Sequence, residues 1–182
     1  MFTVLGMLVG LVVVVLIIAS VKPDTFRIER SLTIAAPPSR VYSLVDDFHH
    51  WASWSPWERL DPALKRTFSG APSGQGAIYE WEGTPKVGTG RMEILQAKAP
   101  SELRIQLDFF KPFEAHNTAE FTMQPDGNGT RVTWAMLGPN PFMMKVMKLF
   151  MNMERMVGKD FETGLQNMKD VAERPDSTRA NS

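Results

Sequence analysis

Residues 28–41 read IERSLTIAAPPSRV, a strand that passes directly into the start of a helix. From Phe26 to Ile34, apolar side chains alternate with polar ones, interrupted only at Arg30, and this period of two predicts a strand with one buried face. The run 35–38 then ends the strand. Pro38 suits the first turn of a helix, because proline lacks an amide hydrogen that this turn would leave unbonded. The folded part of the chain is therefore expected to begin with a strand followed by a helix.

Several strand-like runs follow a second short helix that carries Trp51 and Trp54 and stops at Pro56. Glycine, proline and asparagine separate these runs, and 126–129 (DGNG) is a strong hairpin signal. Because no helix fits into such short connections, we expect an antiparallel, meandering sheet. The expected strands are 64–68, 77–82, 90–97, 102–109, 115–123 and 130–136.

The C-terminal part predicts one long helix. Asn140 suits its N-cap and Pro141 its first turn, and apolar residues then recur at steps of three and four up to Val171. Phe150 and Met153 belong to this apolar stripe, together with Val157 and Phe161 further along the helix. Extra methionines at 143, 147 and 151 widen the stripe, and Gly158 and Gly164 suggest that another group approaches the helix closely.

Residues 2–21 carry no charged side chain and are long enough to cross a bilayer as a helix. A cleaved signal peptide is the alternative, but it would need a basic segment before the apolar run, and no Lys or Arg is present there. We therefore expect residues 1–22 to be a transmembrane anchor that contacts the lipid bilayer through residues 2–21. The expected location is a membrane crossed once, such as a bacterial inner membrane, with the side of the membrane left open.

Composition narrows the classes of partner. The 20 basic and 20 acidic residues balance, so the chain has no net charge with which to hold a nucleic acid. Cysteine is absent, which excludes disulfides, thiolate metal sites and cysteine nucleophiles. The three histidines, His49, His50 and His116, do not have the spacing of a metal site. We expect neither a metal nor another cofactor, and His116 is expected to face solvent.

The order of elements, one strand, two short helices, six strands and a long helix, resembles the helix-grip fold. The stretches 28–41, 48–57 (FHHWASWSPW) and 160–171 (DFETGLQNMKDV) resemble the SRPBCC superfamily, which contains START domains, birch-allergen-like proteins and polyketide cyclases/dehydrases. The resemblance implies an α+β fold in which an antiparallel sheet wraps around the C-terminal helix. It places one domain at residues 23–173, followed by a polar tail, 174–182, that we expect to be disordered.

The same resemblance implies a deep apolar cavity between the sheet and the helix. Trp54 and Trp57 lie in a loop that the family places near one end of this cavity, although these rings could equally serve packing alone. Glu80 and Arg91 are candidate polar groups inside the cavity, and the alternative is that they lie on a solvated outer face of the sheet. Ile105 belongs to the apolar face of the sheet and is a candidate contact for the ligand.

Three functions remain open at this point. The first is a binding module for a hydrophobic or amphipathic small molecule, such as a lipid, an isoprenoid or a polyketide-like compound. The second is a cyclase or dehydratase that uses Glu80 with Arg91 or His116, although no residue is assigned a catalytic role. The third is an adaptor that binds other proteins through an exposed methionine face.

Overall fold

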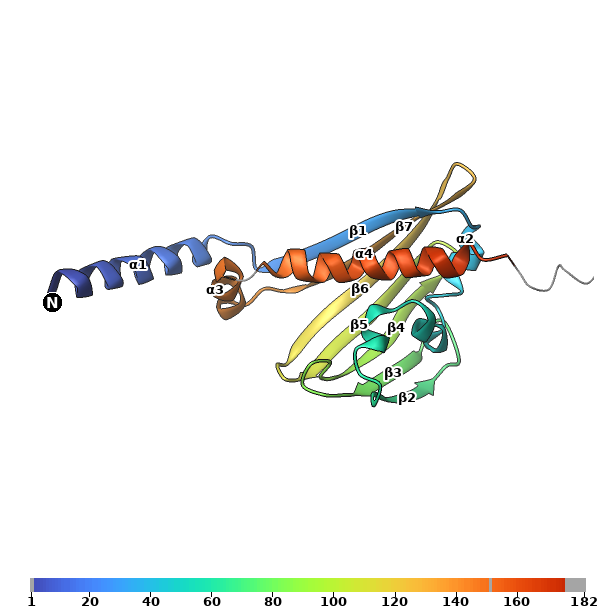
Figure 1. The fold of residues 1–182 in the computed structure, drawn as a ribbon, viewed down its shortest axis with the longest axis horizontal. Coiled ribbons are helices and arrows are strands. Elements are labelled where there is room, and N and C mark those ends of the chain that lie inside the picture. Colours follow the sequence, from blue (N-terminus) through green and yellow to red (C-terminus); the bar gives the residue numbers. More distant parts are fainter. Residues whose placement is uncertain (1, 151, 176–182) are drawn as a thin grey trace, which may run out of the picture.

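The computed structural model describes residues 2–150 and 152–175, so most of the predicted polar tail lies outside the described residues. Figure 1 shows a curved sheet crossed by one long helix, with a second helix that extends away from the domain. In chain order the elements are α1 (Phe2–Ser20), β1 (Thr25–Ile34), α2 (Pro38–Tyr42), η1 (Phe48–Ser53), η2 (Pro56–Arg59), β2 (Lys65–Gly70), β3 (Ala77–Glu82), β4 (Thr89–Lys98), β5 (Glu102–Lys111), β6 (Ala115–Asp126), β7 (Gly129–Pro139), α3 (Phe142–Phe150) and α4 (Met153–Ala172). The short elements η1 and η2 are 3₁₀ helices.

The seven strands form one antiparallel sheet in the order β1-β7-β6-β5-β4-β3-β2. Strands β2 to β7 follow one another as a meander, and β1 pairs with β7. The hairpin signal is confirmed, because Asp126 pairs with Gly129 and Gly127 has a φ of 57°, a value that glycine adopts without strain. The register of β4 against β5 shifts between Ile94 and Gln96, and such irregularities help a sheet to curve.

The predicted single C-terminal helix is wrong, because it is divided into α3 and α4. Asn152 caps α4 by accepting a hydrogen bond from the backbone N–H of Arg155 at 2.9 Å. Asn140, the predicted cap, instead donates its side-chain amide to the carbonyl of Pro23 at 2.9 Å. Lys145 lies 2.6 Å from the Asp24 carboxylate, so α3 is tied to the start of β1 and lies across the direction of α4 (Figure 1).

The core between α4 and the sheet is aromatic. The indole of Trp134 on β7 stacks on Phe161 of α4, with ring centroids 4.2 Å apart and planes 9° apart. On its other neighbour, Phe121 of β6, the centroid distance is 5.0 Å. Trp54 contacts the same indole edge to face at 5.4 Å. These rings join the sheet, α4 and η1 into one core.

The two glycines of α4 do allow close approach, and the approaching groups belong to the protein itself. A Cβ atom on Gly164 would lie 2.7 Å from the Trp134 ring, and one on Gly158 would lie 2.1 Å from the guanidinium of Arg30. Glycine at these positions therefore lets α4 lie directly on β7 and β1, at a cost of about 1 kcal/mol each in helix propensity relative to Ala.

The N-terminal apolar run forms a single helix, α1, followed by a short turn into β1. Within the residues that the structure describes, no helix is long and apolar enough to cross a membrane.

Candidate functional site

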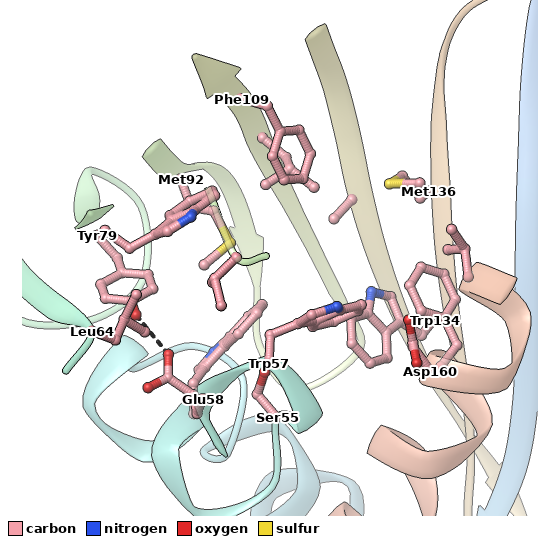
Figure 2. A pocket seen from close by; sticks show the side chains of 17 residues that line it. Ser55, Trp57, Glu58, Leu64, Tyr79, Met92, Phe109, Trp134, Met136 and Asp160 are labelled. Atoms are coloured by element: carbon pink, nitrogen blue, oxygen red, sulfur yellow. Dashed lines mark hydrogen bonds between the residues drawn. The ribbon is translucent and has the colours of Figure 1, made fainter. Parts of the chain in front are cut away.

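A cavity of ≈ 200 Å³ lies between the inner face of the sheet, the η1–η2 segment and α4 (Figure 2). Its floor comes from alternate residues of β3 to β7, whose side chains point to one face because the side-chain period of a strand is two. Its opposite wall comes from η2 and from the first half of α4. The lining residues are Trp51, Ser55, Trp57, Glu58, Leu64, Tyr79, Trp81, Val87, Met92, Leu107, Phe109, Ala119, Trp134, Met136, Val157, Asp160 and Phe161.

Seven of these lining side chains are aromatic. Trp57 stands edge to face against Trp134 at 5.4 Å, and Trp81 stands edge to face against Phe109 at 5.7 Å. Gly90 makes room for the second pair, because a Cβ atom there would lie 2.3 Å from the Trp81 ring. Rigid rings with few rotamers give the cavity a defined apolar surface at little cost in side-chain entropy.

Glu58 and Tyr79 form the most ordered polar group of the lining. The Tyr79 hydroxyl donates a hydrogen bond of 2.6 Å to Glu58, as the dashed line in Figure 2 shows. The other carboxylate oxygen of Glu58 accepts from Arg66 Nε at 2.6 Å, and the Glu58 side chain is only 8% exposed. Burial, and then the hydrogen bond to Glu58, raise the pKa of Tyr79 far above its ordinary value. The phenol therefore keeps its proton, and the group orients side chains rather than exchanging protons with a substrate.

Asp160 is the second acidic side chain of the lining, and it has no such partner. It projects from α4 beside Trp134 (Figure 2) and makes no hydrogen bond or ion pair with any residue that the structure describes. It is half-buried. Burial raises the pKa of Asp160, and the charge of Lys159 opposes this shift.

Of the two predicted tryptophans, Trp57 lines the cavity and Trp54 does not. Trp54 is fully buried in the core, and its indole N–H donates to the carbonyl of Leu44 at 2.8 Å. Ile105 points to the inner face as predicted but is also fully buried, outside the cavity lining, and Leu107 two residues later reaches the cavity instead. Both residues support the wall from behind.

The predicted placement of Glu80 and Arg91 inside the cavity is wrong. They are cross-strand partners on the outer face of the sheet, where Glu80 is exposed and Arg91 pairs with Glu93 at 2.7 Å. Their sequence neighbours Tyr79 and Met92 point inward instead. The alternation that places one residue in the cavity necessarily places the next one outside.

His116, the third candidate for enzymatic chemistry, also lies outside the cavity. It faces solvent as expected, with its ring nitrogens 2.8 Å from Asp108 and 3.2 Å from Glu114. These hydrogen bonds raise the pKa of His116 above its ordinary value. No group of acidic, histidine or cysteine residues within the described chain is arranged to hold a metal ion.

The expected methionines of the C-terminal helix do not form the cavity wall. Met143 and Met147 lie on α3 away from the cavity and are exposed, and Met151 lies outside the described residues. Val157 and Phe161 do line the cavity, as the stripe predicted, but the methionines beside them are Met92 and Met136 from the sheet. A pattern in one helix cannot show which strand residues lie opposite it.

Sequence reasoning missed Glu58 and Asp160. Asp160 follows Val157 by three residues and precedes Phe161 by one, so a helical projection would have placed it at the edge of the apolar stripe. Glu58 follows Trp57 directly, but nothing in the sequence indicates its contacts with Tyr79 or Arg66.

Solved structures with the same fold agree with this architecture. Protein CV1439 from Chromobacterium violaceum superimposes with a TM-score of 0.57 at 16% identity, over 85% of this chain and 100% of its own. The Aha1 dimer protein from Colwellia psychrerythraea gives 0.59 at 13% identity, over 81% and 96%. BexL, a di-domain ARO/CYC protein from the BE-7585A biosynthetic pathway, gives 0.60 at 16% identity, over 87% of this chain and 53% of its own.

These identities are too low to transfer more than the fold, and no curated protein matched the sequence. The sequence profile described as "Polyketide cyclase / dehydrase and lipid transport" matches residues 25–173, from the start of β1 to the end of α4. That match covers the whole sheet, the aromatic cavity and the helix that closes it. The chain therefore belongs to the polyketide cyclase/dehydrase and lipid transport family, with the ligand-binding or cyclase-like role that this family supports.

Proposed function

We propose that this domain binds a compact, mostly apolar small molecule in the cavity between the sheet and α4. The observation that carries the proposal is the cavity itself, whose lining is almost entirely aromatic and aliphatic. An apolar surface of this kind gains free energy when a ligand displaces water from it, at roughly 25 cal/mol for each Å² of apolar surface buried.

The volume of the cavity limits the ligand. Small-molecule sites commonly measure about 300–1,000 Å³, and a dry apolar cavity of about 150 Å³ accepts benzene. A cavity of ≈ 200 Å³ therefore suits a molecule with one or two rings, or one segment of a longer lipid, isoprenoid or polyketide-like compound.

The test is a fluorescence titration of the full-length protein with 1-naphthylmethanol, a neutral two-ring probe. We expect saturable binding of one probe per chain, because the cavity has room for one such ring system. Uptake that rises without saturation would show partition into apolar surfaces and would contradict the proposal.

We further propose that α1 anchors the domain to a lipid bilayer, where apolar ligands concentrate. The support is the sequence of residues 2–21, which contains no charged side chain, together with the 19-residue length of α1. At 1.5 Å per residue this length is about that of the roughly 30 Å hydrocarbon core. The neighbouring helix α3 (Figure 1) adds exposed apolar side chains at Phe142 and Met143.

Replacing Val14 and Ile17 together by Lys should release the full-length protein from membranes. Each lysine near the centre of a membrane helix costs about 2.5–3.5 kcal/mol on insertion scales. The measurement is fractionation after carbonate washing, with Ser69→Lys plus Ala71→Lys as a control that adds the same charge elsewhere. The wild type and the control should pellet with the membranes. A wild-type protein that carbonate extracts completely would contradict the anchor and leave the cavity proposal intact.

A further inference from the structure

The charges of the cavity lining have one sign. Among the lining side chains, the charged ones are Glu58 and Asp160, and none is Lys, Arg or His. A ligand with a carboxylate or phosphate inside the cavity would therefore face acidic groups with no basic group to balance them. Fatty acids and phosphorylated head groups are poor candidates for this position.

Only one of the two acids is available to a ligand charge. Glu58 is already neutralised by Arg66 at 2.6 Å and accepts the Tyr79 hydroxyl. Asp160 lies half-buried at the other end of the lining and has no partner among the described residues. A partly buried carboxylate without a partner is unfavourable, and a donor or cation from the ligand would remove this cost.

The aromatic lining favours the same kind of group. The faces of indole, phenol and phenyl rings carry partial negative charge, and they attract ammonium groups placed within about 6 Å of the ring centroid. Trp134 and Trp57 stand at 89° to each other in the half of the lining that also contains Asp160 (Figure 2). Aromatic faces beside a carboxylate are the usual surroundings of a bound alkylammonium group.

We propose that the cavity selects an apolar amine, whose ammonium group binds the Asp160 carboxylate while its hydrocarbon part fills the aromatic lining. This inference rests on the proposed binding function and adds the chemical class of the ligand. The hydrocarbon part supplies most of the binding free energy, and Asp160 supplies the selection for positive charge over neutral or negative charge.

The test uses three probes with the same two-ring body and different head groups: 1-naphthylmethylamine, 1-naphthylmethanol and 1-naphthoate. The full-length wild type should bind the amine about tenfold more tightly than the alcohol, within the range expected for a partly desolvated cation beside a carboxylate and aromatic rings. The carboxylate probe should bind most weakly. Asp160→Asn should reduce the amine to within about twofold of the alcohol and leave the affinity for the alcohol unchanged.

Two control variants separate this role from a general loss of charge or fold. Asp170→Asn removes an exposed carboxylate from the same helix, where Asp170 accepts only from Gln166, and should keep the preference for the amine. Asp160→Glu should also keep most of the preference. Thermal unfolding of each variant shows whether the fold is retained.

The possible failures are distinct. If the wild type binds amine and alcohol equally, or if Asp160→Asn keeps the preference, solvent alone satisfies Asp160 and this inference is wrong while the binding function stands. An equal loss in Asp170→Asn would also overturn it, because the preference would then come from the overall surface charge. If none of the three probes saturates, the binding function itself fails and the inference falls with it.

Discussion

The Val157→Phe protein is expected to bind 1-naphthylmethanol at least about tenfold more weakly than the wild type. Val157 lies on the wall that α4 contributes to the cavity, so a phenyl ring at this position occupies space that the probe needs. A cavity of ≈ 200 Å³ leaves little room for both. Because the ring enters existing space, the cost in stability should not exceed the roughly 1–3 kcal/mol of overpacked cores.

The neighbouring residue provides a matched control. Met156 is 59% exposed on the same helix, and Met156→Phe adds a ring without reaching the cavity. Probe affinity, from fluorescence titration, and the midpoint of thermal unfolding should both be measured for each variant. A Val157→Phe protein that binds as tightly as Met156→Phe would remove α4 from the binding site.

Replacing Trp134 by Ala should lower the free energy of unfolding by about 3–5 kcal/mol, as truncation of a buried large aromatic side chain commonly does. This indole is 3% exposed and stacks between Phe121 and Phe161, so its removal opens a hole between the sheet and α4. Chemical denaturation monitored by circular dichroism measures the change.

The Trp134→Phe variant separates packing from hydrogen bonding. The indole nitrogen of Trp134 is buried and has no hydrogen-bond partner within the described structure. A phenyl ring keeps the stack and loses no hydrogen bond, so we expect it to cost less than half as much as Ala. If Phe proved as costly as Ala, the indole N–H would have a stabilising partner and the packing account of Trp134 would be wrong.

The strands were predictable because their signals are local. The alternation around Leu103 and Leu107 and the DGNG hairpin depend only on neighbouring residues, and the meander follows from the short connections between strands. The break in the C-terminal helix was not predictable in the same way. Asn152 competes with Asn140 as a cap, and the contacts of Asn140 and Lys145 with residues 23–24 decide between them.

The site was less predictable than the fold because it depends on which face of each strand is buried. The inward pair Tyr79 and Trp81 fixes the parity of β3 and places Glu80 outside, but either parity is compatible with a strand read alone. Trp54 and Trp57 differ by one helical turn, yet only Trp57 reaches the cavity, because the chain turns at Pro56 between them. Contacts such as Glu58 with Arg66 join residues on separate elements and appear only in the folded chain.

The most direct measurement of ligand binding uses the methionines as reporters. Met92 and Met136 line the cavity, Met123 is buried elsewhere in the core, and Met143 is 69% exposed on α3. In a titration of the full-length protein, labelled with ¹³C at the methionine methyl groups, 1-naphthylmethanol should shift the signals of Met92 and Met136 to a plateau at one equivalent bound. The signals of Met123 and Met143 should change little. Shifts confined to Met143, or shifts of all methionines without a plateau, would contradict binding in the cavity.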